Sequence, residues 1–349
     1  MVSQAKLLRR QKQRRRKIDD VVGAQRSLFF LQRSVATGAA LMLLLLSVCG
    51  DERAEAQSTG VAADRFVPAP GPAAFAQVEG ASIAPLGQVW LTGGAVALGD
   101  PLRLRNARTQ VQVSEPVQLR VGMDLAAELG VLRNRLAIGV GLPAALWQRG
   151  DRLVGTGGSA VDADAPLATA AVGDIRLRLK ALITKPEQRL SLAIVTELTF
   201  PGGGQHDFVA TQSATVSPRL IGGLRVGRIS AAANAAVRFA PQRSLYESSL
   251  HNTFEWGVAA AGELPAKRIS LALGVEATGA LNLVSGNYLH STELRSFLRL
   301  AWWRAAIDFG GGGGFGPLTP SWRAILVVRT WFGRRDPEQT GCQVRPATL

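Results

Sequence analysis

The sequence has few of the residues that build metal centres and disulfide frameworks. It contains only two cysteines, Cys49 and Cys342, and three histidines, and none of these forms a CxxC motif or a Cys/His cluster. A structural zinc site therefore lacks ligands, and we expect no cofactor. Beyond the N-terminal region the chain also lacks an uncharged apolar run of the ~18 residues that a membrane-spanning helix needs, which excludes a helical membrane protein.

Acidic residues are outnumbered, because 40 Lys and Arg stand against 26 Asp and Glu and give a formal net charge of +14. Such a balance can indicate nucleic-acid binding. After residue 56, however, the basic residues stand singly between apolar ones, which makes a poor phosphate footprint. We therefore expect no nucleic-acid partner. Glycine is abundant, with 38 residues, which disfavours long helices and suits twisted sheets.

Residues 1–56 contain the three parts of a secretory signal peptide. A basic stretch over residues 9–17 precedes an apolar run over residues 35–48, and Ala54-Glu55-Ala56 provides a small-x-small cleavage site. Two other interpretations stay open. One is an inner-membrane anchor, for which the apolar run is short. The other is lipid attachment at Cys49, although the residue before it is bulkier than usual.

The mature chain changes character at about residue 86. Residues 57–85 are rich in Ala and Pro and predict a linker or an N-terminal lead-in. Beyond them, apolar and polar residues alternate. The odd positions from 175 to 183 are apolar, for example, whereas the even positions from 176 to 180 are Arg or Lys. Because a strand points successive side chains to opposite faces, this pattern predicts strands with one apolar and one wet face. We expect twelve, over residues 86–98, 117–130, 134–147, 173–184, 188–199, 214–226, 229–240, 251–262, 267–280, 291–303, 305–313 and 321–332.

The connections between these strands alternate in length. Outer-membrane barrels have short turns at the periplasmic rim and longer loops at the outer rim. We therefore predict that the long connections face the outside of the cell, and these are residues 99–116, 148–172, 200–213, 241–250 and 281–290.

Strand length and charge placement favour a membrane barrel over a soluble sheet. The expected strands span about ten to fourteen residues, whereas strands of soluble proteins usually have about five or six. Their apolar faces carry no charge, and their opposite faces carry both signs. We predict an all-β fold, a closed antiparallel transmembrane β-barrel of about twelve strands over residues 86–332, followed by a short C-terminal tail over 333–349. The alternative is a soluble exported β-sandwich that binds a partner.

A barrel of this type belongs in the outer membrane of a Gram-negative bacterium. Its expected partners are outer-membrane lipid and, during insertion, the outer-membrane assembly machinery. Aromatic residues lie mostly near the predicted strand ends, as they do in interfacial girdles. They are Trp90, Trp147, Phe200, Trp302, Trp303, Trp322, Trp331 and Phe332.

Five ordered motifs resemble the N-terminal barrel of OmpA-like outer-membrane proteins of myxobacteria. The resemblance covers about residues 63–332, and it implies the location and fold more clearly than any activity. In that family a periplasmic peptidoglycan-binding domain usually follows the barrel. The residues after Phe332 are too few for such a domain, so peptidoglycan binding is not carried over. The motifs are ADRFVP (63–68), GVGLPAALWQRGD (139–151), VGDIRLRLK (172–180), SPRLIGGLRVG (217–227) and FGGGGGFGP (309–317).

The wet faces supply the candidate functional residues. They form either a pore lining with a weak preference for anions or a set of cross-strand ion pairs that plug the lumen, and both interpretations stay open. The candidate lumen-lining residues are Arg120, Asp124, Glu128, Arg176, Arg178, Lys180, Glu197, Arg219, Arg225, Arg238, Glu255, Glu276, Glu293, Arg295, Arg299, Asp308, Arg323 and Arg329.

We predict a structural or passive narrow-pore role and no enzymatic activity. The alternative is an outer-membrane-embedded hydrolase that uses His251 or His290-Ser291 near the loop rim, but no GxSxG motif is present. The glycines from Gly310 to Gly314 are not followed by the Lys-Ser/Thr of a phosphate-binding loop. They predict positions where neighbouring side chains fill the lumen or where a strand bends.

Overall fold

The computed structural model describes most of the chain from residue 62 to residue 333. The predicted signal peptide and residues 334–349 of the predicted tail lie outside the described residues. Within the described part, no helix is long and apolar enough to span a membrane. The described residues are 62, 64–72, 75–105, 112–132, 134–150, 167–185, 188–203, 208–211, 213–241, 243–245, 248–264, 269–283, 290–316 and 319–333.

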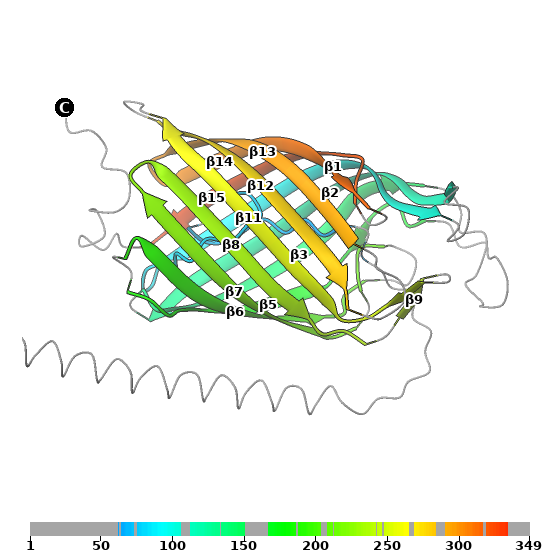
Figure 1. Ribbon diagram of the computed structural model, residues 1–349, viewed down its shortest axis with the longest axis horizontal. Coiled ribbons are helices and arrows are strands. Elements are labelled where there is room, and N and C mark those ends of the chain that lie inside the picture. Colours follow the sequence, from blue (N-terminus) through cyan, green and yellow to red (C-terminus); the bar gives the residue numbers. More distant parts are fainter. Residues whose placement is uncertain are drawn as a thin grey trace, which may run out of the picture. The chain divides into compact units, whose positions relative to one another are not determined.

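Twelve long strands close into one antiparallel barrel (Figure 1). Consecutive strands are hydrogen-bonded neighbours, and the first strand pairs with the last, from Val89 opposite Phe332 to Gly99 opposite Trp322. This closure excludes the soluble β-sandwich, which would need two separate sheets. The strands of the barrel are β1 (Val89–Arg105), β2 (Gln112–Leu132), β3 (Leu136–Arg149), β5 (Ile175–Leu182), β6 (Leu190–Phe200), β7 (Thr215–Val226), β8 (Ile229–Arg238), β11 (Thr253–Leu264), β12 (Ser270–Asn282), β13 (His290–Trp302), β14 (Ala305–Phe315) and β15 (Trp322–Phe332).

The predicted connections differ from the structure at three places. The first connection was expected over residues 99–116, but β1 and β2 continue their pairing as far as Arg105 and Gln112. Register shifts beyond Gly99 let this pairing pass Pro101, which cannot donate a ladder hydrogen bond. The connection expected over residues 241–250 contains a small hairpin of β9 (Arg243–Leu245) and β10 (Ser248–Leu250). A further short strand, β4 (Ala171–Val172), pairs with β3.

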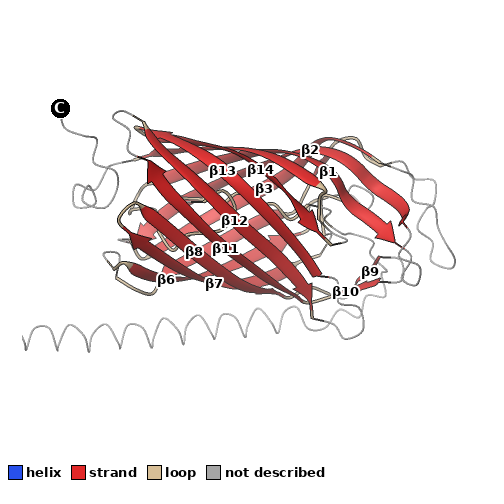
Figure 2. Ribbon diagram, turned by 45° about the horizontal axis from the view of Figure 1, so that its top comes forward, coloured by secondary structure: helices blue, strands red, loops and turns tan. Residues whose placement is uncertain are grey.

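The barrel has two ends with different connections. We call the end with the tight links, such as Gly227-Arg228 between β7 and β8, the turn end, and the opposite end the loop end. β1 begins and β15 finishes at the turn end, because Val89 pairs with Phe332. In Figure 2 the paired ends of β1 and β2 extend beyond the other strands at the loop end.

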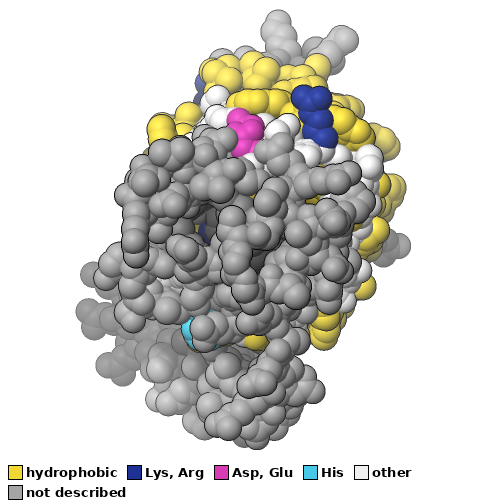
Figure 3. Space-filling view, turned by 90° about the vertical axis from the view of Figure 1, so that its right-hand side faces the viewer, with side chains coloured by type: hydrophobic (Ala, Val, Ile, Leu, Met, Phe, Trp, Pro, Cys, Tyr) yellow, Lys and Arg dark blue, Asp and Glu magenta, His cyan; other side chains and the backbone are white. Residues whose placement is uncertain are grey.

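The outer wall of the barrel is apolar. Ile175, Leu177 and Leu179 of β5 are 44%, 43% and 40% exposed, whereas the alternate residues Arg176 and Arg178 are buried. Figure 3, which looks onto the loop end, shows mostly hydrophobic side chains around the described part of the wall. The period-two pattern therefore directs apolar side chains outward, where lipid solvates them, and charged side chains inward.

Two of the eight predicted girdle aromatics lie on the inner face. Trp90 is buried, and its ring stacks on that of Trp331 at a centroid distance of 4.7 Å. The two residues face each other across the β1–β15 pairing, where an even position of β1 meets an inward position of β15. The Trp90 indole N–H donates to Gln88 Oε1 at 2.8 Å. The stacked pair therefore packs inside the turn end.

Candidate functional site

The inside of the barrel is occupied by the chain's own N-terminal residues. We call residues 64–84 the lumen segment, and residues 73–74 within it are not described. Its atoms contact inward-facing side chains on β5, β8, β12 and β15, which lie on different sides of the closed ring. Only a segment inside the barrel can reach all of these strands. The sequence predicts a linker or an N-terminal lead-in over residues 57–85 but does not indicate that these residues lie inside the lumen.

Glu79 of the lumen segment lies at the centre of a cluster of cations. Its carboxylate pairs with Arg178 on β5, with Lys180 Nζ at 3.1 Å and with Arg219 Nη1 at 3.4 Å. Asn234 on β8 holds the backbone of the same residue, because its Oδ1 accepts from the Glu79 N–H and its Nδ2 donates to the Glu79 carbonyl, both at 2.8 Å. Glu79 is thereby tied to both charged and neutral groups of the wall.

The middle of the lumen segment is bound through its backbone. The carboxylate of Glu276 on β12 accepts from the N–H groups of Ala76 at 2.6 Å and Gln77 at 3.1 Å. On β15, Arg329 donates to the carbonyls of Ala69 at 3.2 Å and Phe75 at 2.9 Å. An ionised side chain makes stronger hydrogen bonds than a neutral one. These contacts therefore fix the segment's path independently of its mostly apolar side chains.

The first residues of the lumen segment contact the loop-end half of the barrel. The Asp64 carboxylate pairs with Arg323 Nη1 at 2.8 Å, and Arg65 Nη1 donates to Ser291 Oγ at 3.1 Å. The Phe66 ring lies against two guanidinium groups, with its centroid 5.3 Å from Arg323 Cζ and 5.5 Å from Arg295 Cζ. Both distances are within the range of cation–π attraction.

Glycines on the wall and in the segment allow this close packing. A Cβ at Gly94 of β1 would lie 2.5 Å from Pro68 Cγ, and one at Gly71 would lie 2.2 Å from Glu128 Oε1. Gly71 also has a φ of +70°, which an L side chain rarely adopts. A larger residue at Gly94 would push Pro68 away from the wall, and a larger residue at Gly71 would displace the Glu128 carboxylate.

Apolar side chains complete the interior, which is therefore not a purely wet lumen. Ala81 and Ile83 of the lumen segment belong to a cluster near the turn end with Ala137, Leu182, Ala193, Val195 and Ile221. A larger cluster surrounds the first two thirds of the segment. It consists of Phe66, Phe75, Ala76, Val78, Val96, Leu98, Ala232, Ala259, Ala261, Phe297, Ile325 and Val327.

The structure places most of the candidate lumen-lining charges inside the barrel. Arg225 differs, because it lies next to the tight turn after β7 and its side chain is 45% exposed, paired with Glu263. Four others, Arg219, Arg238, Glu255 and Arg299, are half-buried. The buried ones are Arg120, Asp124, Glu128, Arg176, Arg178, Lys180, Glu197, Glu276, Glu293, Arg295, Asp308, Arg323 and Arg329.

Ion pairs join many of these charges across neighbouring strands. Asp308 on β14 accepts from Arg299 Nε at 2.6 Å and also pairs with Arg329. Arg295 on β13 pairs with Glu276 on β12, with Nη2 and Oε2 3.6 Å apart. Buried charges need such partners because desolvation of an isolated charge is costly. The buried charges named here are therefore neutralised by ion pairs with other wall residues, and the cations around Glu79 by ion pairs with that residue.

One cavity inside the described part of the barrel lies towards the loop end. A cavity of about 160 Å³ borders the start of the lumen segment, and its charged lining includes Arg120, Asp124, Arg176, Glu197 and Arg238. A polar cavity of this volume can hold water.

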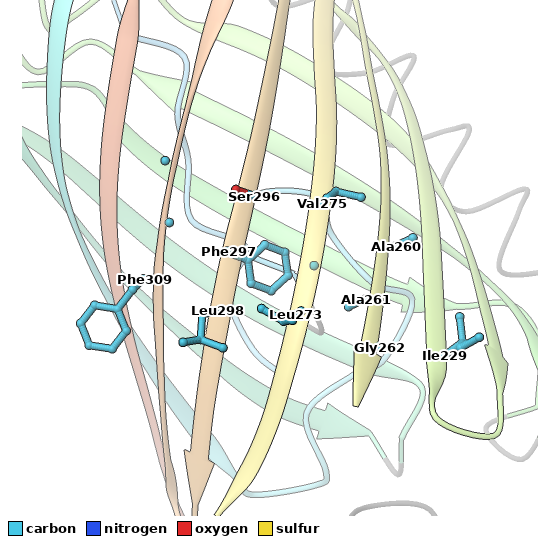
Figure 4. Close-up of a pocket in the computed structure, with 13 residues that line it drawn as sticks. Ile229, Ala260, Ala261, Gly262, Leu273, Val275, Ser296, Phe297, Leu298 and Phe309 are labelled. Atoms are coloured by element: carbon cyan, nitrogen blue, oxygen red, sulfur yellow. The ribbon is translucent and has the colours of Figure 1, made fainter. Parts of the chain in front are cut away.

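A second hollow lies on the outer wall. It has a volume of about 650 Å³ and is lined by residues of β11 to β14 and by Ile229 at the start of β8 (Figure 4). The wall is thin there, because Gly274 and Gly310 carry no side chain and the Phe297 ring covers Gly274 from inside, with Cζ 2.3 Å from where a Cβ would be. The lining is almost wholly apolar, as suits contact with lipid hydrocarbon.

The residues considered for a hydrolase do not converge. His290 is exposed, whereas its neighbour Ser291 is buried and its hydroxyl accepts from Arg65. The two side chains thus point to opposite faces of β13, which is the geometry that a strand imposes. Among the described residues there is no group of three or more His, Cys, Asp or Glu side chains that could hold a metal ion.

Comparison with known proteins supports the barrel at the level of its fold. No protein-family model and no curated protein matches the sequence. Among solved structures, an outer-membrane channel from Pseudomonas putida F1 is similar, with a TM-score of 0.54 and 15% sequence identity over 72% of this chain and 97% of that chain. The β domain of a Bordetella autotransporter is similar over 70% of this chain and 99% of its own length, with 10% identity and a TM-score of 0.41. The chain has the fold of a Gram-negative outer-membrane β-barrel.

Proposed function

We propose that this protein is a passive outer-membrane barrel whose lumen segment leaves a narrow path for small solutes or none. The observation that carries the proposal is the position of residues 64–84 inside the ring, bound to the wall through Glu79, Glu276 and Arg329. Twelve strands enclose an interior between that of a filled eight-stranded barrel and that of an open sixteen-stranded porin. A segment of this length with mostly apolar side chains is enough to obstruct an interior of this size.

The charges also bear on the kind of solute. The candidate wall residues include more basic than acidic side chains, which favours anions in any path that remains. The acidic residues Asp64 and Glu79 of the lumen segment offset part of this excess. We therefore propose a weak anion preference. A hydrolase is not favoured, since Ser291 and His290 face apart.

Planar-bilayer recording on the refolded mature chain tests the proposal. We expect small or unmeasurable conductance from the unaltered protein and clearly larger conductance after deletion of residues 64–84. A second variant, Glu79→Ala with Glu276→Ala, loosens the segment without removing it and should give brief openings. Large, stable conductance of the unaltered chain would contradict a closed lumen. A clear cation preference would contradict the proposed selectivity.

We also propose that the chain is related to the N-terminal barrels of OmpA-like outer-membrane proteins of myxobacteria. The order of the five motifs supports this relation. The first motif, residues 63–68, contributes Asp64 to the pair with Arg323 and Phe66 to the contacts with two arginines. If the relation holds, the same segment should lie inside the barrel of a family member. A crystal structure of such a barrel with an empty lumen would contradict it.

A further inference from the structure

The two ends of the lumen segment lie at opposite ends of the barrel, and its first residues lie at the loop end. Asp64 pairs with Arg323, the second residue of β15, and Arg65 donates to Ser291, the second residue of β13. β13 follows the long connection 281–290, and β15 begins at the loop end because it finishes at the turn end. The first described residues of the chain are therefore level with the loop-end rim.

The last residues of the lumen segment lie at the opposite end. The carbonyls of Ala84 and Pro85 approach Gly130, where an added Cβ would be 2.3 Å and 2.1 Å from them. Gly130 is beside the tight link between β2 and β3, which belongs to the turn end. Leu86 then forms a parallel bridge with Gly130, and β1 starts at Val89.

The intermediate contacts lie between these two ends of the barrel. Ala69 and Phe75 meet Arg329, which is in the turn-end half of β15, and Ala76 meets Glu276 in the middle of β12. Glu79 and Gly80 then meet Lys180, near the turn-end limit of β5. The segment therefore runs from the loop end to the turn end but folds back on the way. Ala69 lies beside the turn-end half of β15, Ala76 lies beside the middle of β12, and the Ala69 N–H donates to the Ala76 carbonyl at 2.9 Å.

We infer that the mature protein presents its N-terminal end at the loop end, on the same side of the membrane as the long loops. The other end of the lumen segment is covalently continuous with β1, which is held in the wall on both edges. A partner protein on the turn-end side could therefore not bind a free chain end of the lumen segment. If the lumen opens, the segment must withdraw towards the loop end, so the opening stimulus acts there. This last step rests on the proposed closed lumen.

Cysteine labelling in intact cells tests the direction of threading. In a background with Cys49→Ala and Cys342→Ser, single cysteines are placed at Ser58, ahead of the lumen segment, at Ser159 in a long loop, and at Lys185 in a tight turn. A membrane-impermeant maleimide is added before or after permeabilisation of the outer membrane. We expect Ser58→Cys to label with the same pattern as Ser159→Cys and opposite to Lys185→Cys.

The two reference positions separate this inference from the orientation of the barrel. If Ser58→Cys follows Lys185→Cys, the inference is overturned whichever side the loops face. If Ser58→Cys and Ser159→Cys both label only after permeabilisation, the threading stands and the expected orientation is wrong. Absence of labelling at position 58 under both conditions would also overturn the inference, because that end would then be enclosed. None of these outcomes depends on whether the lumen conducts, so conductance tests the proposed function separately.

Discussion

Replacement of Glu79 by Gln removes one charge from the interior and little else. The Glu79 side chain is only 1% exposed and pairs with Arg178, Lys180 and Arg219. The amide of Gln has nearly the same size and shape. The two hydrogen bonds between the backbone of residue 79 and Asn234 do not involve the carboxylate, so they should persist. The variant therefore isolates the electrostatic role of the carboxylate.

The free-energy cost of Glu79→Gln depends on which partners the three cations around residue 79 retain. Arg178 keeps Glu197 at 3.1 Å, Arg219 keeps Glu255 at 4.0 Å, and Lys180 keeps the carbonyl of Gly80 at 2.7 Å. Removal of one partner from a buried ion pair typically costs about 3–5 kcal/mol, because it leaves an uncompensated charge. That range corresponds to about two to three and a half powers of ten in the equilibrium between the folded and unfolded barrel.

The matched control is Glu263→Gln, which makes the same chemical change at the rim. Its pair with Arg225 has side chains 33% and 45% exposed, so solvent screens it and the expected loss is about 0.2–1 kcal/mol. Urea unfolding in lipid vesicles, followed by tryptophan fluorescence, gives both free energies, and bilayer recording reports detachment of the lumen segment. If Glu79→Gln is no more destabilising than Glu263→Gln and leaves conductance unchanged, the carboxylate does not hold the segment.

Three further predictions follow from the wall. Leu177→Arg places a charge on the lipid-facing side and should cost about 2–4 kcal/mol if it lies at the midplane, measured as lost refolding into bilayers, whereas Leu177→Ile should refold normally. Gly312→Ala brings a Cβ to 1.9 Å from the Leu294 carbonyl oxygen and should destabilise the β13–β14 pairing, whereas Gly262→Ala meets nothing within 4 Å and should be neutral in the same unfolding assay. Cysteines in residues 148–172 should label in intact cells and those in residues 184–188 should not. The reverse labelling pattern would mean that the barrel has the opposite orientation in the membrane.

The wall of the barrel could be predicted from the sequence because it obeys a simple period. Each strand alternates between lipid and interior, so Leu177 and Arg178 reveal their faces by position alone. Strand length and loop alternation then indicate closure in a membrane. The limits of β1 and β2 were less predictable, since the pairing past Pro101 depends on register shifts that leave no periodic signature.

The contents of the barrel could not be predicted in the same way. The described residues of the lumen segment have no regular secondary structure, so the segment shows no hydrophobic period, and its Ala and Pro content is typical of linkers. Two signals were present. One is Glu79, the only charged residue between Phe66 and Ala84. The other is the row of small inward residues, such as Ala232, Ala259 and Ala261, which leaves room for an extra chain. Which cations meet Glu79 depends on tertiary packing.

The β1–β15 pairing and the lumen segment together constrain the order of assembly. Arg323 on the last strand contacts Asp64, which is 259 positions away in sequence, so this contact cannot form until nearly the whole chain is in place. Contacts between such distant residues impose a large loop-closure entropy and slow folding. The same strand pairs with β1 along the wall. The two ends of the barrel sequence are therefore joined twice, once through the wall and once through the interior. A chain that ends before β15 would lose both the β1–β15 pairing that closes the barrel and the β15 contacts that hold the lumen segment.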